Sequence, residues 1–554
     1  MVDISTLSIL LLLGMFLLLA IGMPLGFASA TLAVGVLVLK FGPNVLYGNV
    51  VGGVEMMMDG ELAAGVDTAF AKFGRGPLGV ISQAVYRQMT NYILISVPLF
   101  IFMAAILERS GIAKDMYSSI NVWLSRTRGG IAIVTSIMAV VMAAMSGIIG
   151  GEVVLLGLIA LPQMLRLGYN QNLAIGTICA SGSLGTMIPP SIVLIFYGLI
   201  TETSIKALFT AAFLPGFILA SSFILYIIIR TRLRPEDAPL PEPVEGDPEV
   251  GEKRILFLTF LTILVTGFFT LMLGRALFLT VIGSNTITED VAPISWGMVA
   301  DLPMLFGMTI AGLGLLWFVF KKHRVLQAWS MGKGLVAPII VIGVVLGSIY
   351  GGITGITEAA GMGVVAVFLL SVLRGEMTFN VVWDSLMRTM KSTGTIIWVT
   401  IGAASLAAAY TLVGGPTYIA NLIVGQNLPT MGIILAMMFV FLIMGMFMDW
   451  VGIVLLIMPV FLPIVLRLPV AELGFWGHIE PKYVGIWFGV VFCMNMQVSF
   501  LSPPFGPAAF YLKSVAPAHI SLTDIFKGFL PFIALQLFSL AILLTWPNLV
   551  TVFL

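Results

Sequence analysis

The chain has 554 residues, of which 59% are hydrophobic and only 10% are charged, and its mean hydropathy is +1.09. This composition excludes an ordinary soluble globular protein, and a formal net charge of +1 gives no reason to expect a nucleic-acid partner. Long continuous apolar runs, rather than alternating segments of about ten residues, predict an all-α polytopic membrane protein and not a β-barrel.

The first half of the chain is mostly apolar. An apolar stretch at 5–40 is interrupted at Pro24, and the more polar, glycine-rich stretch at 41–90 predicts short or interfacial helices. The remaining predicted elements of this half are a span at 92–108, an apolar segment at 130–167, a broken helix at 171–201 and a span at 205–229. Cys179 and Cys493 lie inside apolar segments, so we expect reduced thiols rather than a disulfide.

The helix at 171–201 carries a double proline, Pro189-Pro190, in an apolar setting. Proline lacks a backbone donor and clashes with the preceding turn, so a helix that enters this stretch must break. A break at membrane depth is tolerated only where the freed backbone groups are buried in protein or line a wet cavity. Glycine and hydroxyl residues flank the break, which favours an ion or anion site built from backbone groups.

The middle of the chain contains a polar linker and two further apolar segments. The linker at 230–254 is rich in Pro, Glu and Asp, and we expect it to be too polar to fold into a core. Spans are predicted at 255–283 and 302–320, and the loop at 284–301 between them has no Lys or Arg. The positive-inside rule therefore places 230–254 and 321–333 in the cytoplasm and 284–301 outside.

The second half repeats the pattern of the first. Its predicted elements are spans at 334–350, 356–374 and 389–413, an apolar segment at 430–467, a broken helix at 483–512 and a last span at 522–548. The Leu-Pro segment 161–167 matches 462–468, and Pro189-Pro190 matches Pro503-Pro504. The chain therefore contains an internal repeat. An odd number of membrane crossings between the two copies would give them opposite orientations in the membrane.

Each half also has an apolar segment ahead of its broken helix that is too long for one span and too short for two spans with a loop. Small or polar residues lie at the middle of each segment: Ser146 and Gly147 in the first, Gly445 and Asp449 in the second. A re-entrant hairpin fits this pattern. Paired hairpins and paired broken helices are typical of secondary transporters that are built from repeats.

The stretch Gly182–Gly198, with its Gly-Ser-Leu-Gly-Thr-Met-Ile-Pro-Pro-Ser-Ile core, resembles the signature of the large membrane subunit of tripartite ATP-independent periplasmic (TRAP) transporters. Supporting stretches lie at 97–100, 161–169, 351–360, 488–491 and 502–506. The resemblance covers 5–230 and 334–550. The central insert departs from the usual pattern and resembles the branch that is often labelled mannitol/chloroaromatic transporters.

The resemblance implies an inverted-repeat, elevator-type secondary transporter in the bacterial inner membrane. Its implied partners are a small membrane subunit of four spans, expected as a separate chain, and a periplasmic binding protein that delivers an organic acid. Sodium is the implied coupling ion. Lacking Gly-x-Ser-x-Gly, His-Glu-x-x-His and phosphate-loop motifs, the chain is expected to be neither an enzyme nor a primary pump, and to need no cofactor. The alternative is a stand-alone ion-coupled transporter or channel for small organic anions.

Together, the resemblance and the repeat divide the chain into eight parts. These are N-terminal scaffold helices at 1–129, the first hairpin and broken helix of a transport domain at 130–201, a span at 202–229, the cytoplasmic linker at 230–254, two inserted transmembrane helices at 255–333, scaffold helices of the second repeat at 334–429, the second hairpin and broken helix at 430–512, and a C-terminal span at 513–554.

Sodium prefers oxygen ligands, and backbone carbonyls at a helix break supply them without burying a full charge. The sodium ligands predicted in the first half are Ser146, Gly147, Ser183, Gly185, Thr186 and Pro189. Those predicted in the second half are Gly445, Asp449, Asn495, Ser502 and Pro503. The alternative is that these small residues only allow helices to pack closely.

Asp449 is the strongest single candidate, because a carboxylate within an apolar run costs ~2.5–3.5 kcal/mol on insertion scales and usually has a partner or an ion. It could instead cap the second hairpin helix. Substrate is expected between the hairpin tips and the breaks, at Pro190, Ser191, Pro504 and Phe505. Helix N-termini that follow the breaks point partial positive charge inward, which suits a carboxylate.

Overall fold

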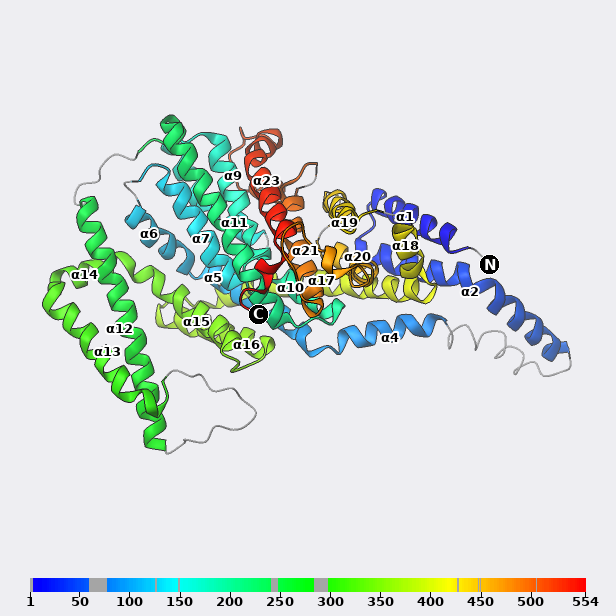
Figure 1. The fold of residues 1–554 in the computed structure, drawn as a ribbon, viewed down its shortest axis with the longest axis horizontal. Coiled ribbons are helices and arrows are strands. Elements are labelled where there is room, and N and C mark those ends of the chain that lie inside the picture. Colours follow the sequence, from blue (N-terminus) through cyan, green and yellow to red (C-terminus); the bar gives the residue numbers. More distant parts are fainter. Residues whose placement is uncertain are drawn as a thin grey trace.

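The computed structural model describes residues 3–58, 77–124, 127–147, 150–240, 248–282, 297–425, 428–446, 448, 450–504 and 506–554. Every regular element within these ranges is helical (Figure 1). Nine of the described helices are long and apolar enough to cross a membrane. The predicted all-α polytopic fold is confirmed.

The N-terminal helices form a group, part of which packs on one long helix from the second half, α17 (Phe379–Leu412). They are α1 (Ile4–Ala20), α2 (Leu25–Met58), α4 (Pro77–Met89), α5 (Ser96–Arg109) and α6 (Ile112–Leu124), with a short 3-10 turn at Tyr92–Ile95. Helices α2, α4 and α5 all contact α17. A Cβ atom at Gly402 would lie 2.1 Å from the carbonyl oxygen of Gly26, so glycine at this position lets α17 and α2 meet backbone to backbone.

The first repeat contains the predicted hairpin and broken helix. Its elements are α7 (Gly130–Ser146), α8 (Gly151–Arg166), α9 (Gln171–Gly182), a 3-10 turn at Leu184–Thr186, α10 (Ile192–Thr201) and α11 (Ile205–Leu233). Helix α9 ends before the double proline and α10 begins after it. The helix therefore breaks where the sequence predicts.

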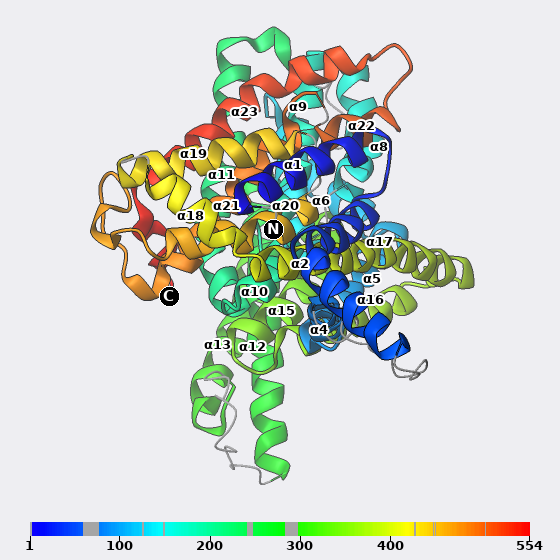
Figure 2. The same ribbon diagram turned by 90° about the vertical axis from the view of Figure 1, so that its right-hand side faces the viewer.

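The second repeat has the same order of elements. They are α19 (Thr430–Gly445), α20 (Trp450–Val465), α21 (Val484–Leu501), α22 (Pro507–Lys513) and α23 (Leu522–Thr545). Both Pro-Pro bonds, Pro189-Pro190 and Pro503-Pro504, are cis. Short helix α18 (Gly415–Val424), which the sequence did not predict, precedes this repeat and lies beside α1 near the N-terminus (Figure 2).

The two repeats exchange partners. Helix α10, which follows the first break, packs on the second hairpin helix α20, and α22, which follows the second break, packs on the first hairpin helix α8. In the same way α11 packs on α21, and α23 packs on α9. This reciprocal packing is what a two-fold relation between the repeats produces, and it joins both hairpins and both breaks into one body.

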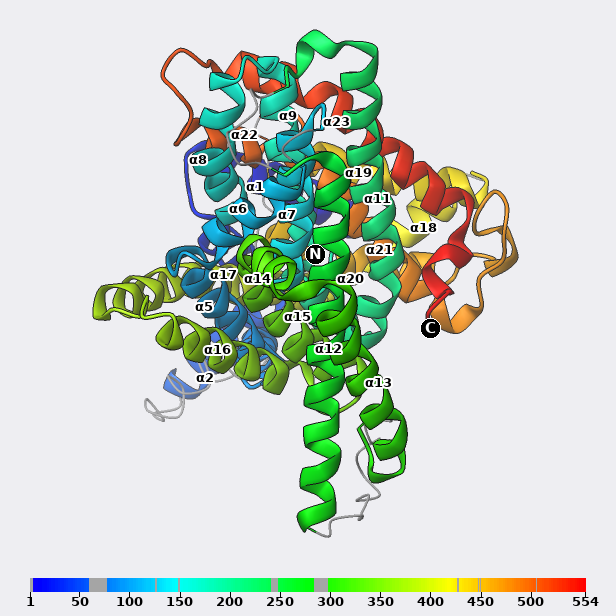
Figure 3. The same cartoon turned by 90° about the vertical axis from the view of Figure 1, so that its left-hand side faces the viewer.

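The central insert lies at the opposite end of the molecule from α1 and α2 (Figure 1). Helix α12 (Val250–Ile282) runs beside α13 (Leu302–Gly314), which continues through a π-helical turn at Leu315–Val319 (Figure 3). The polar stretch that follows folds as α14 (Lys321–Gly332) and leads into α15 (Val336–Tyr350), which packs on α16 (Ile356–Leu373). Helices that are long and apolar enough to cross a membrane therefore lie at both positions where the sequence predicts inserted spans.

The linker prediction is wrong for its first part. Asp237 is buried and accepts a hydrogen bond from Arg230 Nε at 2.8 Å, and its carbonyl oxygen accepts one from the Asn170 amide at 2.9 Å. The linker therefore begins by folding back against α11 and the start of α9. Its residues 241–247 lie outside the described part of the chain.

Candidate functional site

The first hairpin tip meets the first helix break. Helix α7 ends at Ser146. The next residue, Gly147, has a φ of 60° in the left-handed region, and its carbonyl oxygen accepts a hydrogen bond from the Ile192 amide at 3.4 Å. A Cβ atom at Gly147 would lie 2.0 Å from the Pro190 carbonyl oxygen. Only glycine satisfies both the backbone conformation and this approach.

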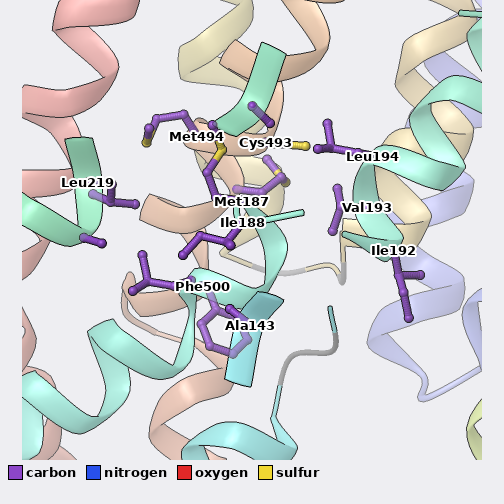
Figure 4. Packing of buried hydrophobic residues seen from close by; sticks show 14 of the residues in the cluster. Ala143, Met187, Ile188, Ile192, Val193, Leu194, Leu219, Cys493, Met494 and Phe500 are labelled. Atoms are coloured by element: carbon purple, nitrogen blue, oxygen red, sulfur yellow. The ribbon is translucent and has the colours of Figure 1, made fainter. Parts of the chain in front are cut away.

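A network of hydrogen bonds holds the first break. Thr186 Oγ1 donates to the Ser183 carbonyl at 3.0 Å, and Ser191 Oγ donates to the Thr186 carbonyl at 2.5 Å. All three residues are buried. Figure 4 shows that Met187 and Ile188, on the same segment, lie among buried apolar side chains that include Leu219 and Met494. The polar groups of the break are therefore enclosed by apolar packing.

Two buried glutamines that the sequence analysis missed reach this break from the second repeat. Gln497 of α21 donates through Nε2 to Thr186 Oγ1, and Gln536 of α23 donates through Nε2 to Ser183 Oγ at 3.5 Å. The Oε1 atoms of both glutamines are buried and accept no hydrogen bond from any described residue. Each glutamine therefore presents an unsatisfied oxygen next to the first break, the kind of atom that a cation ligates.

The second break is built differently. Ser502 Oγ donates within its own helix to the Val498 carbonyl at 2.7 Å, while Asn495 Nδ2 donates at 2.9 Å to the Met438 carbonyl of α19. A Cβ atom at Gly445 would lie 2.3 Å from the side chain of Ser499, so the end of α19 touches α21 closely. The end of the hairpin helix α19 is thus in contact with α21, the helix that leads into the second break.

A small cavity of about 20 Å³ lies at this second contact, with Gly445 and Ser499 in its wall. This is the space of a single water-sized particle. The remaining lining residues are Met448, Trp450, Met496, Phe500 and Pro507. Asp449 and Phe505, which the sequence analysis selected as ion and substrate ligands, lie outside the described residues.

The first hairpin also meets the N-terminal helices at an ion pair. Glu108 of α5 pairs with Arg388 of α17, and a Cβ atom at Gly151 would lie 2.2 Å from Glu108 Oε1. Next to it, Ser146 Oγ donates to Glu152 Oε1, and the other carboxylate oxygen of Glu152 is buried without a described partner. A cavity of about 450 Å³ lies beside the Glu108–Arg388 pair, with Gly151 also in its wall.

The structure brings the first hairpin tip, at Ser146 and Gly147, to the break that contains Ser183, Gly185, Thr186, Pro189, Pro190 and Ser191. It brings Gly445 to α21, which carries Asn495 and is followed by Ser502 and Pro503. Ser191 also accepts a hydrogen bond from the Leu194 amide at 3.5 Å and caps α10, whose N-terminus therefore faces the hairpin tip. This arrangement suits a cation among carbonyl and amide oxygens and an anion at the start of α10.

Comparison with known proteins agrees with this architecture. The model of the tripartite ATP-independent periplasmic transporter DctM component matches residues 12–549. The ectoine TRAP transporter large permease protein TeaC of Halomonas elongata is 26% identical over 482 residues, which cover 86% of this chain and 89% of that protein. The C4-dicarboxylate TRAP transporter large permease protein DctM of Pseudomonas aeruginosa is 34% identical over 153 residues.

The alignment with the Pseudomonas permease covers 27% of this chain and 36% of that protein, about a third of its length. Among solved structures, the YdaH transporter of Alcanivorax borkumensis superposes with a TM-score of 0.45 at 13% identity, covering 93% of this chain and 97% of that one. The family match spans both repeats and the insert, and confirms the resemblance found in the sequence. The chain belongs to the DctM component family of the tripartite ATP-independent periplasmic transporters, a family of multi-pass bacterial inner-membrane transporters and not of enzymes.

Proposed function

We propose that this chain is the large permease subunit of a sodium-coupled TRAP transporter that imports an organic acid by an elevator mechanism. The observation that carries the proposal is the pair of broken helices, each in contact with a hairpin tip of its own repeat and packed on a hairpin helix of the other. Such a pair supplies backbone oxygens for cations and helix N-termini for an anion in one enclosed place.

The proposed sodium sites lie at the two breaks. The first comprises Ser146, Gly147, Ser183, Gly185, Thr186 and Pro189, to which the structure leads us to add Gln497. The second comprises Gly445, Asp449, Asn495, Ser502 and Pro503. The unsatisfied Oε1 of Gln497 supports the first site and the small cavity beside Gly445 supports the second. Each sodium ion that enters along a membrane potential of 100 mV contributes about 2.3 kcal/mol, so two ions are enough to concentrate an anion strongly.

The proposed substrate is an organic acid that binds between the hairpin tips and the breaks, at Pro190, Ser191, Pro504 and Phe505. The N-terminus of α10, capped by Ser191, supports this position because its partial positive charge attracts a carboxylate. The relatives described above are named for ectoine and C4-dicarboxylates, which carry carboxylate groups. A periplasmic binding protein would deliver the substrate, and a small four-span membrane subunit would complete the transporter.

In the proposed elevator, the hairpins and breaks move as one body against the helices that surround α17. The reciprocal packing of α10 on α20 and α22 on α8 supports a single moving body. The Glu108–Arg388 pair, which lies against Gly151 at the start of α8, belongs to the surface along which this body would slide.

Uptake into vesicles tests the proposal. The chain is reconstituted with its small subunit, and labelled organic acid is supplied with the binding protein in the presence or absence of an inward sodium gradient. We expect accumulation above equilibrium only with the gradient, and we expect Asp449→Ala to abolish it while leaving the protein folded. Uptake that stops at equilibrium and depends on neither sodium nor the binding protein would instead show a channel.

A further inference from the structure

We propose that a phospholipid with an anionic headgroup binds between the inserted helix α12 and the helices α6 and α7. A cavity of about 730 Å³ lies there, which we call the insert cavity. It is lined by apolar side chains from all three helices and by two basic residues at the start of α12, Lys253 and Arg254. Neither the sodium sites nor the substrate site of the proposed function involves this region.

The apolar part of the insert cavity suits an acyl chain. Its walls include Ile120 and Leu124 of α6, Ile137 and Val141 of α7, and Phe257 and Leu258 of α12. Apolar cavities of this kind exclude water and take apolar ligands. Because all of these helices belong to a membrane protein, the apolar molecule that is available to them at high concentration is lipid.

Helix α12 is attached to α6 by aromatic contacts and a hydrogen bond. The ring of Trp123 lies 5.5 Å from that of Phe257 and 6.2 Å from that of Phe260, and Lys253 Nζ donates to the Val122 carbonyl at 3.0 Å. Leu256 and Phe260 form a small buried cluster with Ala328 of α14 that is separate from the main core. A bound acyl chain would add apolar contact between α12 and α7 where the protein itself leaves a gap.

The basic residues give the cavity two chemically different ends. Arg254 is exposed and forms no ion pair with any described residue, and its neighbour Lys253 is buried against α6. Both belong to the end of the linker that the positive-inside rule places in the cytoplasm, where lipid headgroups are anionic. An apolar cavity with cations at its headgroup end matches an anionic phospholipid better than a protein helix, which would need apolar surface along its whole length.

Fluorescence quenching by brominated lipids tests the proposal, because Trp123 lines the cavity. The full chain is reconstituted in vesicles of phosphatidylethanolamine and phosphatidylglycerol, with one of the two lipids carrying brominated chains. The contribution of Trp123 is the difference between the wild type and Trp123→Phe. We expect brominated phosphatidylglycerol to quench Trp123 more strongly than brominated phosphatidylethanolamine. Arg254→Gln should lower this preference about fivefold, the effect of one Lys or Arg near an anionic surface.

Matched variants distinguish the cavity from the general surface. Arg234→Gln, which removes an exposed cation elsewhere on the linker, should leave the preference unchanged. Val141→Phe fills the cavity without changing its charge and should reduce quenching by both lipids, whereas Leu271→Phe, on the exposed side of α12, should not. Three outcomes would each overturn the proposal: equal quenching by the two lipids, loss of the preference when inorganic phosphate is added, and protection of Trp123 from quenching by the small subunit.

Discussion

The two helix breaks share their double prolines and their place in the repeat, but they are held by different contacts. The first is fixed from across the molecule, because Gln497 and Gln536 of the second repeat donate to Thr186 and Ser183. The polar side chain of Ser502, at the second break, bonds only within its own helix. Side-chain hydrogen bonds from the other repeat therefore hold the first break, whereas the hydrogen bond of Ser502 stays within its own helix.

The two hairpins also differ in the contacts that they make with the N-terminal helices. At the start of α8, Gly151 lies against the Glu108–Arg388 ion pair. Near the start of α20, a Cβ atom at Gly452 would lie 2.3 Å from a methyl group of Leu25, on α2. One hairpin thus meets the N-terminal helices at a polar contact and the other at an apolar one. The two halves of the repeat therefore differ in chemistry at these contacts.

Alanine at the two hairpin glycines should show the largest difference. At Gly147 a Cβ atom meets the backbone of Pro190, which no side-chain change can relieve, and the positive φ adds strain. We expect Gly147→Ala to reduce uptake at least a hundredfold, with a loss of stability of about 1–3 kcal/mol. At Gly445 the obstacle is the side chain of Ser499, so Ser499→Gly should rescue Gly445→Ala.

The measurements are sodium-driven uptake and thermal unfolding in detergent for the two single variants and the double variant. Failure of Ser499→Gly to restore any uptake to Gly445→Ala would contradict the side-chain explanation. Wild-type uptake by Gly147→Ala would show that the hairpin tip does not need its close approach to the break.

Removal of Gln497 should weaken sodium binding at the first break. Leucine in this position leaves Thr186 Oγ1 without its donor and removes the free Oε1, and a lost buried hydrogen bond costs about 1–3 kcal/mol. We expect Gln497→Leu to raise the sodium concentration for half-maximal uptake about tenfold. Gln536→Leu is the matched control, because its bond to Ser183 is long at 3.5 Å, and it should have a smaller effect. Equal sodium dependence in the wild type and Gln497→Leu would remove Gln497 from the site.

The polar and apolar hairpin contacts should respond differently to truncation. Arg388→Gln leaves the carboxylate of Glu108 unpaired, and the Glu108 side chain is only 10% exposed. Because Arg388 itself is 37% exposed, solvent screens the pair, and we expect a cost of only about 1–2 kcal/mol. In the double variant Arg388→Gln/Glu108→Gln, part of that stability should return. Leu25→Ala removes an apolar contact, so the stability that it loses should be the same with or without Glu108→Gln. Thermal unfolding of the single and double variants measures the coupling, and strictly additive losses would contradict it.

The elements of the site were predictable because their signals are local. A double proline breaks a helix, whereas single prolines such as Pro162 and Pro215 lie inside helices α8 and α11. The breaks were therefore predictable from Pro189-Pro190, and the hairpin from small residues such as Gly147 at the middle of an apolar segment that is too long for one span. The glutamines were missed because a polar residue within an apolar helix does not by itself indicate which distant residue it contacts. Gln497 and its partner Thr186 are 311 positions apart in the sequence, and Gln536 and its partner Ser183 are 353 positions apart. A buried polar residue in a predicted span is the signal that could have found both.

The first part of the linker was predicted wrongly for a different reason. Asp237 was assigned to a solvated linker because its neighbours are polar and proline-rich, yet Arg230 and the Asn170 amide provide the partners that allow its burial. The stretch at 321–333, which the charges place in the cytoplasm, folds as α14, a helix that the charge pattern does not predict. Charge patterning indicates on which side of a membrane a segment lies, but not whether that segment packs as a helix.

The smallest expected effect lies at the end of α16, away from both breaks. The Arg374 guanidinium binds Glu376 through two hydrogen bonds of 2.9 Å and also pairs with Asp115 of α6. The hydrogen bonds to Glu376 raise the pKa of Arg374, so the guanidinium stays charged at every pH at which the protein is folded. Since these groups are partly exposed, we expect Arg374→Gln to cost about 0.2–1 kcal/mol and to leave the sodium dependence of uptake unchanged. A changed sodium dependence would show that the α6–α16 contact is coupled to the breaks. The difference between the two breaks would then depend on contacts outside the hairpins.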